Sequence, residues 1–234
     1  MAKFLITNDD GYGAPGIEEL IGLCEKRGSV CVIAPDRPRS GVGHAFTTRE
    51  TLGLIEYGPG RFSLTGMPAD CVRVGLTEIA PEAEWVVAGI NAGGNLGADV
   101  YTSGTLAAAR EGALLGKPSL AISQYIGPNR DLVWPEVAAH ADRLLDHVLG
   151  LGCDKYRYWN ANLPPSDYQQ PPIVRCSVDP SPMGVRYKRE DGSLMWNGNY
   201  HERPRIENSD VDKCFNGSIA LTNLSLLQGL SDTD

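Results

Sequence analysis

Four short apolar runs constrain the fold of this chain most strongly. They are KFLIT, SVCVIA, EWVVAG and PSLAIS, at residues 3–7, 29–34, 84–89 and 118–123. Strands that are apolar almost throughout are typical of parallel sheets covered by helices on both faces. Helical spacing of apolar residues is found between and after these runs, at residues 16–28, 70–79, 103–116 and 131–149. The alternation predicts an α/β fold with a doubly wound, mostly parallel sheet.

The other segments predict smaller elements around that sheet. Residues 51–57 and 61–65 flank Gly-Pro-Gly and predict a β-hairpin, whereas residues 90–102 predict a long glycine-rich loop. After about residue 151 the pattern weakens, and strands are expected at residues 156–163, 173–178 and 219–227. Residues 180–212 are rich in proline, glycine, tyrosine and charge, and predict an extended arm or hairpin.

Charge and cysteine content limit the partners and the compartment. The net charge of −8 disfavours general binding to nucleic acid or to an anionic membrane, which requires a basic face. No run is apolar and long enough to span a membrane, and no signal-peptide pattern precedes the first strand. The six cysteines form no CxxC pair, and Cys24, Cys31 and Cys71 lie in apolar patterns typical of buried free thiols. We therefore expect a reduced, cytoplasmic protein.

Polar residues follow three of the predicted parallel strands. Asp9 and Asp10 come after the first strand, Ser40 lies in the loop after the second, and Asn91 follows EWVVAG. The carboxyl ends of parallel strands share one edge of a sheet, where α/β proteins bind ligands. Carboxylate, hydroxyl and amide oxygens are hard ligands that suit Mg²⁺, Mn²⁺ or Ca²⁺ rather than zinc. Together they predict a cation site that offsets the repulsion within Asp9-Asp10.

Each of these residues also has an ordinary structural explanation when it is taken alone. Asp9-Asp10 is compatible with an acidic turn or helix cap, Asn91 with a side chain that stabilises its loop, and Ser40 with a turn hydroxyl. The prediction of a cation site depends on their shared position at strand ends.

A phosphate site is predicted beside them. Ser103, Gly104 and Thr105 begin a predicted helix, where free N–H groups and the helix dipole favour an anion. An ordinary serine N-cap explains the same residues locally. Asn95 is a candidate amide donor from the preceding loop, and His44, in the loop of Ser40, is a candidate for contact with substrate.

Several familiar sites are excluded. No GK[ST] sequence and no GxSxG elbow is present. GYGAPG after the first strand has the spacing of GxGxxG, but Asp9 and Asp10 stand where a dinucleotide pyrophosphate would need to approach. His140 and His147 lie seven residues apart on the late predicted helix, and solvated or edge positions are expected for them rather than catalysis.

Five separated motifs resemble the survival protein SurE family of metal-dependent nucleotidases. They are ITNDDGYGAPGI, APDRPRSGVGH, GMPADCV, VAGINAGGNLGADV and SGTLAAAREG, in this order over roughly residues 1–125. YWNANLP and residues 209–227 resemble the family more loosely. The resemblance implies a Rossmann-like core and a 5′(3′)-nucleotidase that acts on nucleoside monophosphates.

The resemblance also assigns roles to residues. It implies metal ligation by Asp9, Asp10, Ser40 and Asn91, and phosphate contacts by Asn95, Ser103, Gly104 and Thr105. One Mg²⁺ or Mn²⁺ per subunit is expected, or Ca²⁺ in a crystal. The chain departs from the family where Met67, Ala98, Thr102 and Arg110 replace its usual Thr, Asp, Tyr and Met, and the second and third of these lie near the expected substrate loop.

The resemblance further implies a homodimer or tetramer held by a C-terminal arm, for which residues 180–212 are the candidate. We expect one domain over residues 1–234. In it, residues 1–150 form the α/β core that carries the site, and residues 151–234 complete the core and supply the oligomerisation arm.

The predicted reaction is phosphomonoester hydrolysis by water activated at the cation, with Asp9 or Asp10 orienting the water. An aspartyl-phosphate mechanism is the rival within enzymology, although such phosphatases generally separate two aspartates by one residue. Two further candidate functions are a non-catalytic nucleotide-binding or sensing module and a broader acid phosphatase or exopolyphosphatase.

Overall fold

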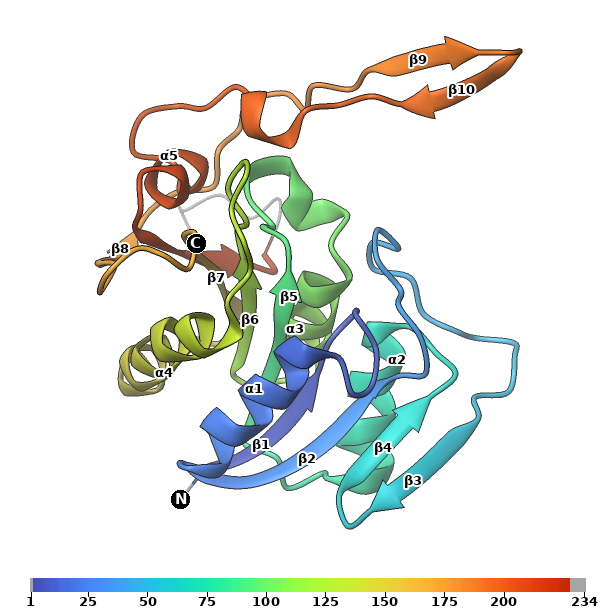
Figure 1. Ribbon diagram of the computed structural model, residues 1–234. Coiled ribbons are helices and arrows are strands. Elements are labelled where there is room, and N and C mark those ends of the chain that lie inside the picture. The colour runs from blue at the N-terminus through green and yellow to red at the C-terminus, as the bar shows by residue number, and fades with distance from the viewer. Residues whose placement is uncertain (1, 228–234) are drawn as a thin grey trace.

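The computed structural model describes residues 2–227 (Figure 1). Its main sheet has nine strands in the order β3-β4-β2-β1-β5-β6-β7-β11-β8, and β9 and β10 form a separate hairpin. The strands are β1 (Ala2–Thr7), β2 (Gly28–Pro35), β3 (Leu54–Gly58), β4 (Arg61–Leu64), β5 (Trp85–Ala92), β6 (Ser119–Gln124), β7 (Arg157–Leu163), β8 (Ile173–Arg175), β9 (Tyr187–Glu190), β10 (Ser193–Trp196) and β11 (Ile219–Ser225).

Within the described residues, five α-helices and three short helical turns connect the strands. The α-helices are α1 (Pro15–Glu25), α2 (Pro68–Val74), α3 (Gly104–Leu114), α4 (Trp134–Leu151) and α5 (Asp210–Phe215). The turns are the π-helical η1 (Gly75–Ile79) and the 3-10 turns η2 (Gly97–Tyr101) and η3 (Tyr200–Glu202).

The sheet reverses its winding direction next to β1. β1 pairs in parallel with β2 on one side and with β5 on the other, so that Leu5 lies opposite both Cys31 and Val86. The chain adds β2 and β4 outward on one side before it crosses to β5, β6 and β7 on the other. A crevice opens at such a switch point, outside the carboxyl ends of the two diverging strands. The predicted doubly wound, mostly parallel sheet is confirmed.

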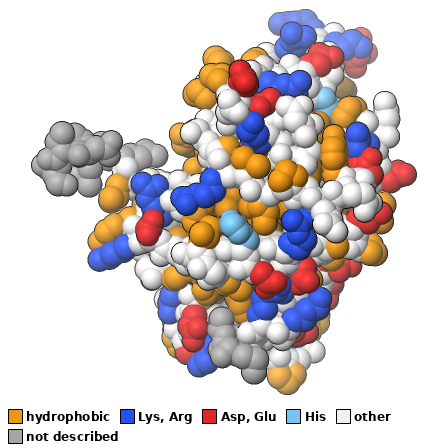
Figure 2. All heavy atoms as spheres, turned by 90° about the vertical axis from the view of Figure 1, so that its left-hand side faces the viewer, with side chains coloured by type: hydrophobic (Ala, Val, Ile, Leu, Met, Phe, Trp, Pro, Cys, Tyr) orange, Lys and Arg blue, Asp and Glu red, His pale blue; other side chains and the backbone are white. Residues whose placement is uncertain are grey.

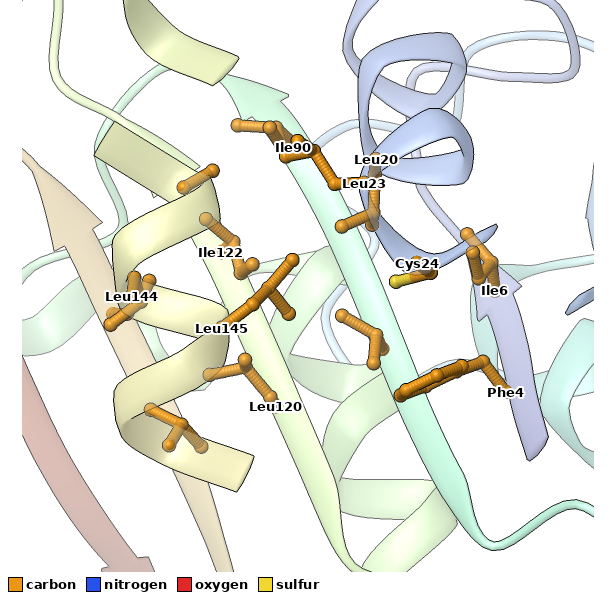
Figure 3. Close-up of a cluster of buried hydrophobic side chains, with 14 of the residues drawn as sticks. Phe4, Ile6, Leu20, Leu23, Cys24, Ile90, Leu120, Ile122, Leu144 and Leu145 are labelled. Atoms are coloured by element: carbon orange, nitrogen blue, oxygen red, sulfur yellow. The ribbon is translucent and has the colours of Figure 1, made fainter. Parts of the chain in front are cut away.

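Helices cover both faces of the sheet because alternate residues of its strands point to opposite sides. Phe4 and Ile6 of β1 face α1 and α4, where they pack with Leu20 and Leu145 among others (Figure 3). Leu5, between them, packs into the opposite cluster with residues of α2. This double cover explains why the central strands are apolar at successive positions.

Two connections differ from the sequence predictions. The expected loop at residues 90–102 contains the last three residues of β5 and the turn η2. The expected helix at residues 70–79 is α2 followed by η1. A Cβ at Gly75 would lie 2.6 Å from Leu5 Cδ2, so glycine allows the chain to pass close to β1 where the helix changes.

The C-terminal third completes the sheet. β11 pairs antiparallel with β7 and parallel with β8, and the predicted hairpin of β3 and β4 is confirmed on the other edge. The expected arm at residues 180–212 contains β9, β10 and η3, but its last residues begin α5. In Figure 1 the β9–β10 hairpin projects from the rest of the molecule.

His140 corrects one expectation, whereas His147 is exposed as predicted. His140 is buried, and its Nε2 lies 2.9 Å from the carbonyl oxygen of Tyr168, so it is an internal residue that holds a loop. Burial lowers its pKa below the usual value.

The cysteines and the distribution of charged side chains can be compared with what the sequence predicts. All six cysteines, which lie within the described residues, are free; Cys24 and Cys71 are buried as predicted, and Cys31 is partly exposed. No helix in the described part of the chain is long and apolar enough to cross a membrane. On the face that carries α4 and β8, acidic and basic side chains are interspersed (Figure 2).

Candidate functional site

Asp9 and Asp10 lie in a tight turn directly after β1. The Asn8 side chain closes this turn, because its Nδ2 donates to the Gly11 carbonyl (2.9 Å) and its Oδ1 accepts from the Gly11 N–H (3.1 Å). Gly11 has φ +101°, and a Cβ there would meet the Arg37 carbonyl carbon at 3.2 Å. Glycine is required for both reasons, so the sequence NDDG packs tightly against the loop after β2.

The loop after β2 reaches the first aspartate through the backbone. The Arg39 N–H donates to the Asp9 carbonyl oxygen at 2.7 Å, and the Tyr12 N–H donates to the Pro35 carbonyl at 2.8 Å. These bonds bring Ser40, which follows Arg39, beside the aspartate turn. The Ser40 side chain is exposed.

The loop after β5 reaches the second aspartate. The Ala92 N–H lies 3.3 Å from Asp10 Oδ2. The neighbouring Asn91 uses its amide nitrogen to bond the Gly93 carbonyl at 2.7 Å. Its amide oxygen has no hydrogen-bond partner among the described residues, and is therefore available to a ligand.

The start of α3 contacts Asp9 itself. Thr105 Oγ1 donates to Asp9 Oδ1 at 2.5 Å, and a Cβ at Gly104 would lie only 2.9 Å from the Asp9 Cβ. Ser103 caps the helix by accepting from the Leu106 N–H at 3.1 Å. Glycine therefore lets the first turn of α3, where backbone N–H groups and the helix dipole favour negative charge, approach a carboxylate.

The electrostatics of the pair favour a cation. Burial raises the pKa of Asp9 to about 6; the Thr105 hydrogen bond opposes this shift, and the Asp10 charge adds to it. Burial also raises the pKa of Asp10, against its bond from Ala92. Within residues 2–227, no Lys, Arg or His side chain forms an ion pair with either aspartate. Two adjacent carboxylates without a cationic partner, Asp9 buried and Asp10 partly exposed, fit a bound divalent ion.

The described residues contain no group of three or more His, Cys, Asp or Glu side chains that could hold a metal ion. This agrees with the predicted ligand set, which has only two carboxylates and takes its other oxygens from Ser40 and Asn91. A site of this composition suits a hard cation that keeps water ligands, such as Mg²⁺.

Asn95 is held from the sheet side. Its N–H donates to Asn162 Oδ1 at 2.7 Å, and its carbonyl accepts from the side chains of Asn160 (3.2 Å) and Asn162 (3.0 Å). Its own Nδ2 donates to Ser123 Oγ at 2.8 Å. The amide nitrogen carries a second hydrogen, so Asn95 retains one donor for a ligand.

His44 lies against the second turn of α3. Its Nε2 is 2.7 Å from Glu111 Oε2 and its Nδ1 is 3.3 Å from Arg110 Nη1. Because arginine only donates, Nδ1 accepts and Nε2 carries the proton. Both ring nitrogens are thus occupied by protein groups, and contact between His44 and substrate stays a prediction.

Sequence reasoning missed the residues that support the site from behind. Glu111 is buried and also accepts from Arg73 Nε at 2.6 Å. Asn160 and Asn162 are fully buried on β7. The alternation in WNANL was the available signal, since two polar residues two apart on an otherwise apolar strand share one face.

Fold and site together define a Rossmann-like α/β protein whose candidate ligand site lies at the switch point of the sheet. The model of the family described as "Survival protein SurE" matches residues 4–182. The chain belongs to the SurE family, and the resemblance stated from its motifs is confirmed.

Individual relatives agree over nearly the whole length. A protein of Synechocystis sp. (strain ATCC 27184 / PCC 6803 / Kazusa) is 41% identical over 224 residues, 95% of this chain and 99% of that protein. The "5′-nucleotidase SurE" of Geobacter sulfurreducens is 36% identical over 231 residues, 96% of this chain and 88% of that protein. The crystal structure of the SurE protein from Aquifex aeolicus superposes with a TM-score of 0.84 at 32% identity, covering 98% of this chain and 95% of that chain.

Proposed function

We propose that this protein is a divalent-metal-dependent 5′(3′)-nucleotidase that hydrolyses nucleoside monophosphates to nucleoside and phosphate. One observation carries the proposal: Gly104 and Thr105, at the start of α3, are in contact with the unpaired Asp9 carboxylate. A helix start suits the phosphate, and the carboxylates suit the cation that must lie between two anions. Membership of a family whose relatives are named 5′-nucleotidases supports the same activity.

Each residue has a definite task in this proposal. Bound Mg²⁺ or Mn²⁺ supplies a Lewis acid and lowers the pKa of water. Asp9 and Asp10 hold it, with Ser40 and Asn91 completing the protein ligands. One of the two aspartates also orients the attacking water. The water oxygen forms the new bond to phosphorus as the ester bond breaks, and the proton of the water goes to the departing nucleoside oxygen.

Phosphate binding is assigned to the start of α3 and the preceding loop. The hydroxyl of Ser103, the N–H groups of Gly104 and Thr105, and the spare amide hydrogen of Asn95 are donors to phosphate oxygens. Donors fixed by the fold stabilise charge that develops in the transition state without reorganising.

The test is phosphate release from AMP and GMP with Mg²⁺ or Mn²⁺, with and without a chelator. We expect turnover that the chelator abolishes and added Mn²⁺ restores. Full activity in chelator would overturn the metal requirement, a trapped phospho-enzyme would favour the aspartyl-phosphate route, and tight AMP binding without release would favour a binding module. Hydrolysis of short polyphosphate or of simple phosphoesters at equal rates would indicate the broader phosphatase.

We also propose that the β9–β10 hairpin joins copies of this chain into a dimer or tetramer. Leu194, Met195 and Trp196 of β10 are 58–60% exposed, and Tyr187 of β9 is 60% exposed. Apolar residues concentrated on a projecting hairpin are typical of an interface. Light scattering should report a dimer or larger, and Leu194→Asp should shift the mass to a monomer; a monomeric parent protein would contradict the proposal.

A further inference from the structure

The chain that follows the β9–β10 hairpin returns to the main body at η3, and there it contacts the loop that carries Asn95. The Tyr200 hydroxyl lies 3.0 Å from the Gly94 carbonyl oxygen and 3.1 Å from Asp99 Oδ2. The hydroxyl is therefore within hydrogen-bond distance of Gly94, directly before Asn95, and of Asp99, four residues after it.

Arg203 binds the same loop through a bidentate ion pair with Asp99. Its Nη1 is 2.6 Å from Asp99 Oδ2, and its Nη2 is 3.1 Å from Asp99 Oδ1. Nη1 also donates to the Leu96 carbonyl at 3.1 Å. The two side chains are only 11% and 16% exposed, so solvent screens this pair little.

Two glycines of the Asn95 loop allow later parts of the chain to approach it closely. A Cβ at Gly94 would lie 2.8 Å from the Tyr200 hydroxyl oxygen. Gly97 has φ +54°, and a Cβ there would meet the Asp179 carbonyl oxygen at 3.2 Å. These glycines therefore make room for later parts of the chain, Gly94 for Tyr200 of the arm and Gly97 for Asp179.

Asn95 is consequently held between two supports. Asn162 and Ser123 bond it from the sheet, and Tyr200 and Arg203 bond the residues on either side of it from the arm. Neither arm residue contacts the aspartate turn in the hydrogen bonds and ion pairs of the described chain. A change in the arm should therefore affect the phosphate side of the site and leave the cation side unchanged.

We propose that Tyr200 and Arg203 are positioning residues that fix the place of Asn95, so that the arm sets the affinity of the site for phosphate. The proposal rests on the function proposed above, because it takes Asn95 as a phosphate donor. Removing the Tyr200 hydroxyl frees Gly94 and leaves the fold of the sheet in place, since the Tyr200 ring still packs near Tyr125 and Phe215.

The test is a double-mutant cycle of Tyr200→Phe with Asn95→Ala. For each variant, the KM for AMP, kcat, the Kd for inorganic phosphate in saturating Mn²⁺ and the Kd for Mn²⁺ alone are measured. Tyr200→Phe should raise the KM and the phosphate Kd roughly three- to tenfold, with little change in kcat or in the Mn²⁺ Kd. In the Asn95→Ala background the same change should have almost no further effect, because coupled residues are not additive.

Controls separate positioning from general damage. Tyr187→Phe, on the exposed hairpin, should leave all four quantities unchanged. Arg203→Lys keeps the charge but loses the bidentate hydrogen bonding to Asp99, and should reproduce the effect of Tyr200→Phe. Equal effects of Tyr200→Phe with and without Asn95, or a lowered thermal midpoint with unchanged KM and phosphate Kd, would overturn the proposal. If the parent protein releases no phosphate from AMP, the proposed function fails, whereas the cycle in phosphate Kd still decides the positioning role.

Discussion

Asp9 in the candidate cation site and Asp179 at the root of the arm are both buried, but the fold treats them in opposite ways. They are 4% and 2% exposed. Asp179 accepts hydrogen bonds from the N–H groups of Ser181 (2.8 Å) and Ile206 (2.7 Å) and from the Ser209 hydroxyl (2.6 Å). Burial alone would raise the pKa of Asp179, but these donors lower it to about 2.

Asp9 has weaker donors, because backbone N–H groups of Asp9 and Thr105 and the Thr105 hydroxyl do not offset its burial. It accepts from the Thr105 hydroxyl, lies next to a second carboxylate, and has its pKa raised to about 6 chiefly by burial. The opposite pKa shifts of Asp9 and Asp179 show that burial alone does not indicate a functional carboxylate. An acid whose donors offset its burial is part of the structure, whereas one whose donors do not offset it is available to a cation.

The largest expected effect is a loss of nucleotidase activity when a carboxylate of the candidate cation site is removed. Asp10→Asn, which removes a proposed cation ligand, should lower kcat/KM for AMP by about a hundredfold or more, because even residues that only support metal ligands cost about 10- to 100-fold. Asp131→Asn is the matched control, since Asp131 is an exposed acid far along the chain. Steady-state assays in Mn²⁺ decide, and parental turnover by Asp10→Asn would exclude it from the site.

The same substitution at the two buried acids should change the free energy of unfolding in opposite directions. Without metal at pH 7, Asp179→Asn should lower the free energy of unfolding by about 2 kcal/mol. The amide NH₂ group of the asparagine would face N–H and O–H donors that now bond to the carboxylate. Asp9→Asn should gain about 1 kcal/mol, because it removes a repulsive buried charge. Urea unfolding in chelator measures both, and a loss of stability by both variants would contradict the comparison.

The two acids should also give stability opposite pH dependences. The raised pKa of Asp9 means that the metal-free folded protein binds a proton that the unfolded chain has released, so stability falls as pH rises from about 4 to about 6. The lowered pKa of Asp179 gives stability that is complete above about 4 and is lost as pH falls toward about 2. Each effect is of the order of 2 kcal/mol.

Single substitutions assign these two pH windows. Asp9→Asn should flatten the unfolding free energy between pH 4 and 6, and Asp179→Asn should flatten it below pH 4. With saturating Mn²⁺ the upper window should invert, because protonation competes with the metal. A parent profile that is flat between pH 4 and 6 in chelator would argue against a strained Asp9.

The smallest effect is expected at a third buried acid, Glu111, which pairs with the cation of Arg73 and accepts a hydrogen bond from His44. Burial would raise its pKa, but hydrogen bonds from His44 and Arg73 lower it below the usual value. Arg73→Gln should reduce the unfolding free energy by about 1 kcal/mol, because the arginine is partly exposed and screened. Thermal unfolding measures this, and a stabilisation would show that Glu111 resembles Asp9 rather than Asp179.

The sequence predicted the elements that local pattern controls. The apolar strands, the helices between them and the convergence of polar loops at the carboxyl ends of β1, β2 and β5 all follow from periodicity and from the geometry of parallel sheets. The family was recognised from motifs in the same loops. The metal and phosphate ligands remain predictions, because their assignment depends on bound groups.

Long-range contacts could not be predicted from single segments. Nothing near Gly94 and Gly97 in the sequence indicates that Tyr200 and Asp179 would approach them. His140 resembled an edge residue because its partner, the Tyr168 carbonyl, lies in a loop 28 residues away. The close approach of Leu5, on a distant strand, to Gly75 likewise has no local signal in the sequence.

The most direct test of the central claim, that Asp9 and Asp10 form a cation site, is the thermal midpoint with and without Mn²⁺ for the parent, Asp9→Asn and Asp10→Asn. At a hundred times the Kd, binding adds about 2.7 kcal/mol, which corresponds to a rise of roughly 5 to 10 °C for a chain of this size. We predict that rise for the parent and little or none for either variant. An equal rise in all three proteins, or none in the parent, would contradict the account.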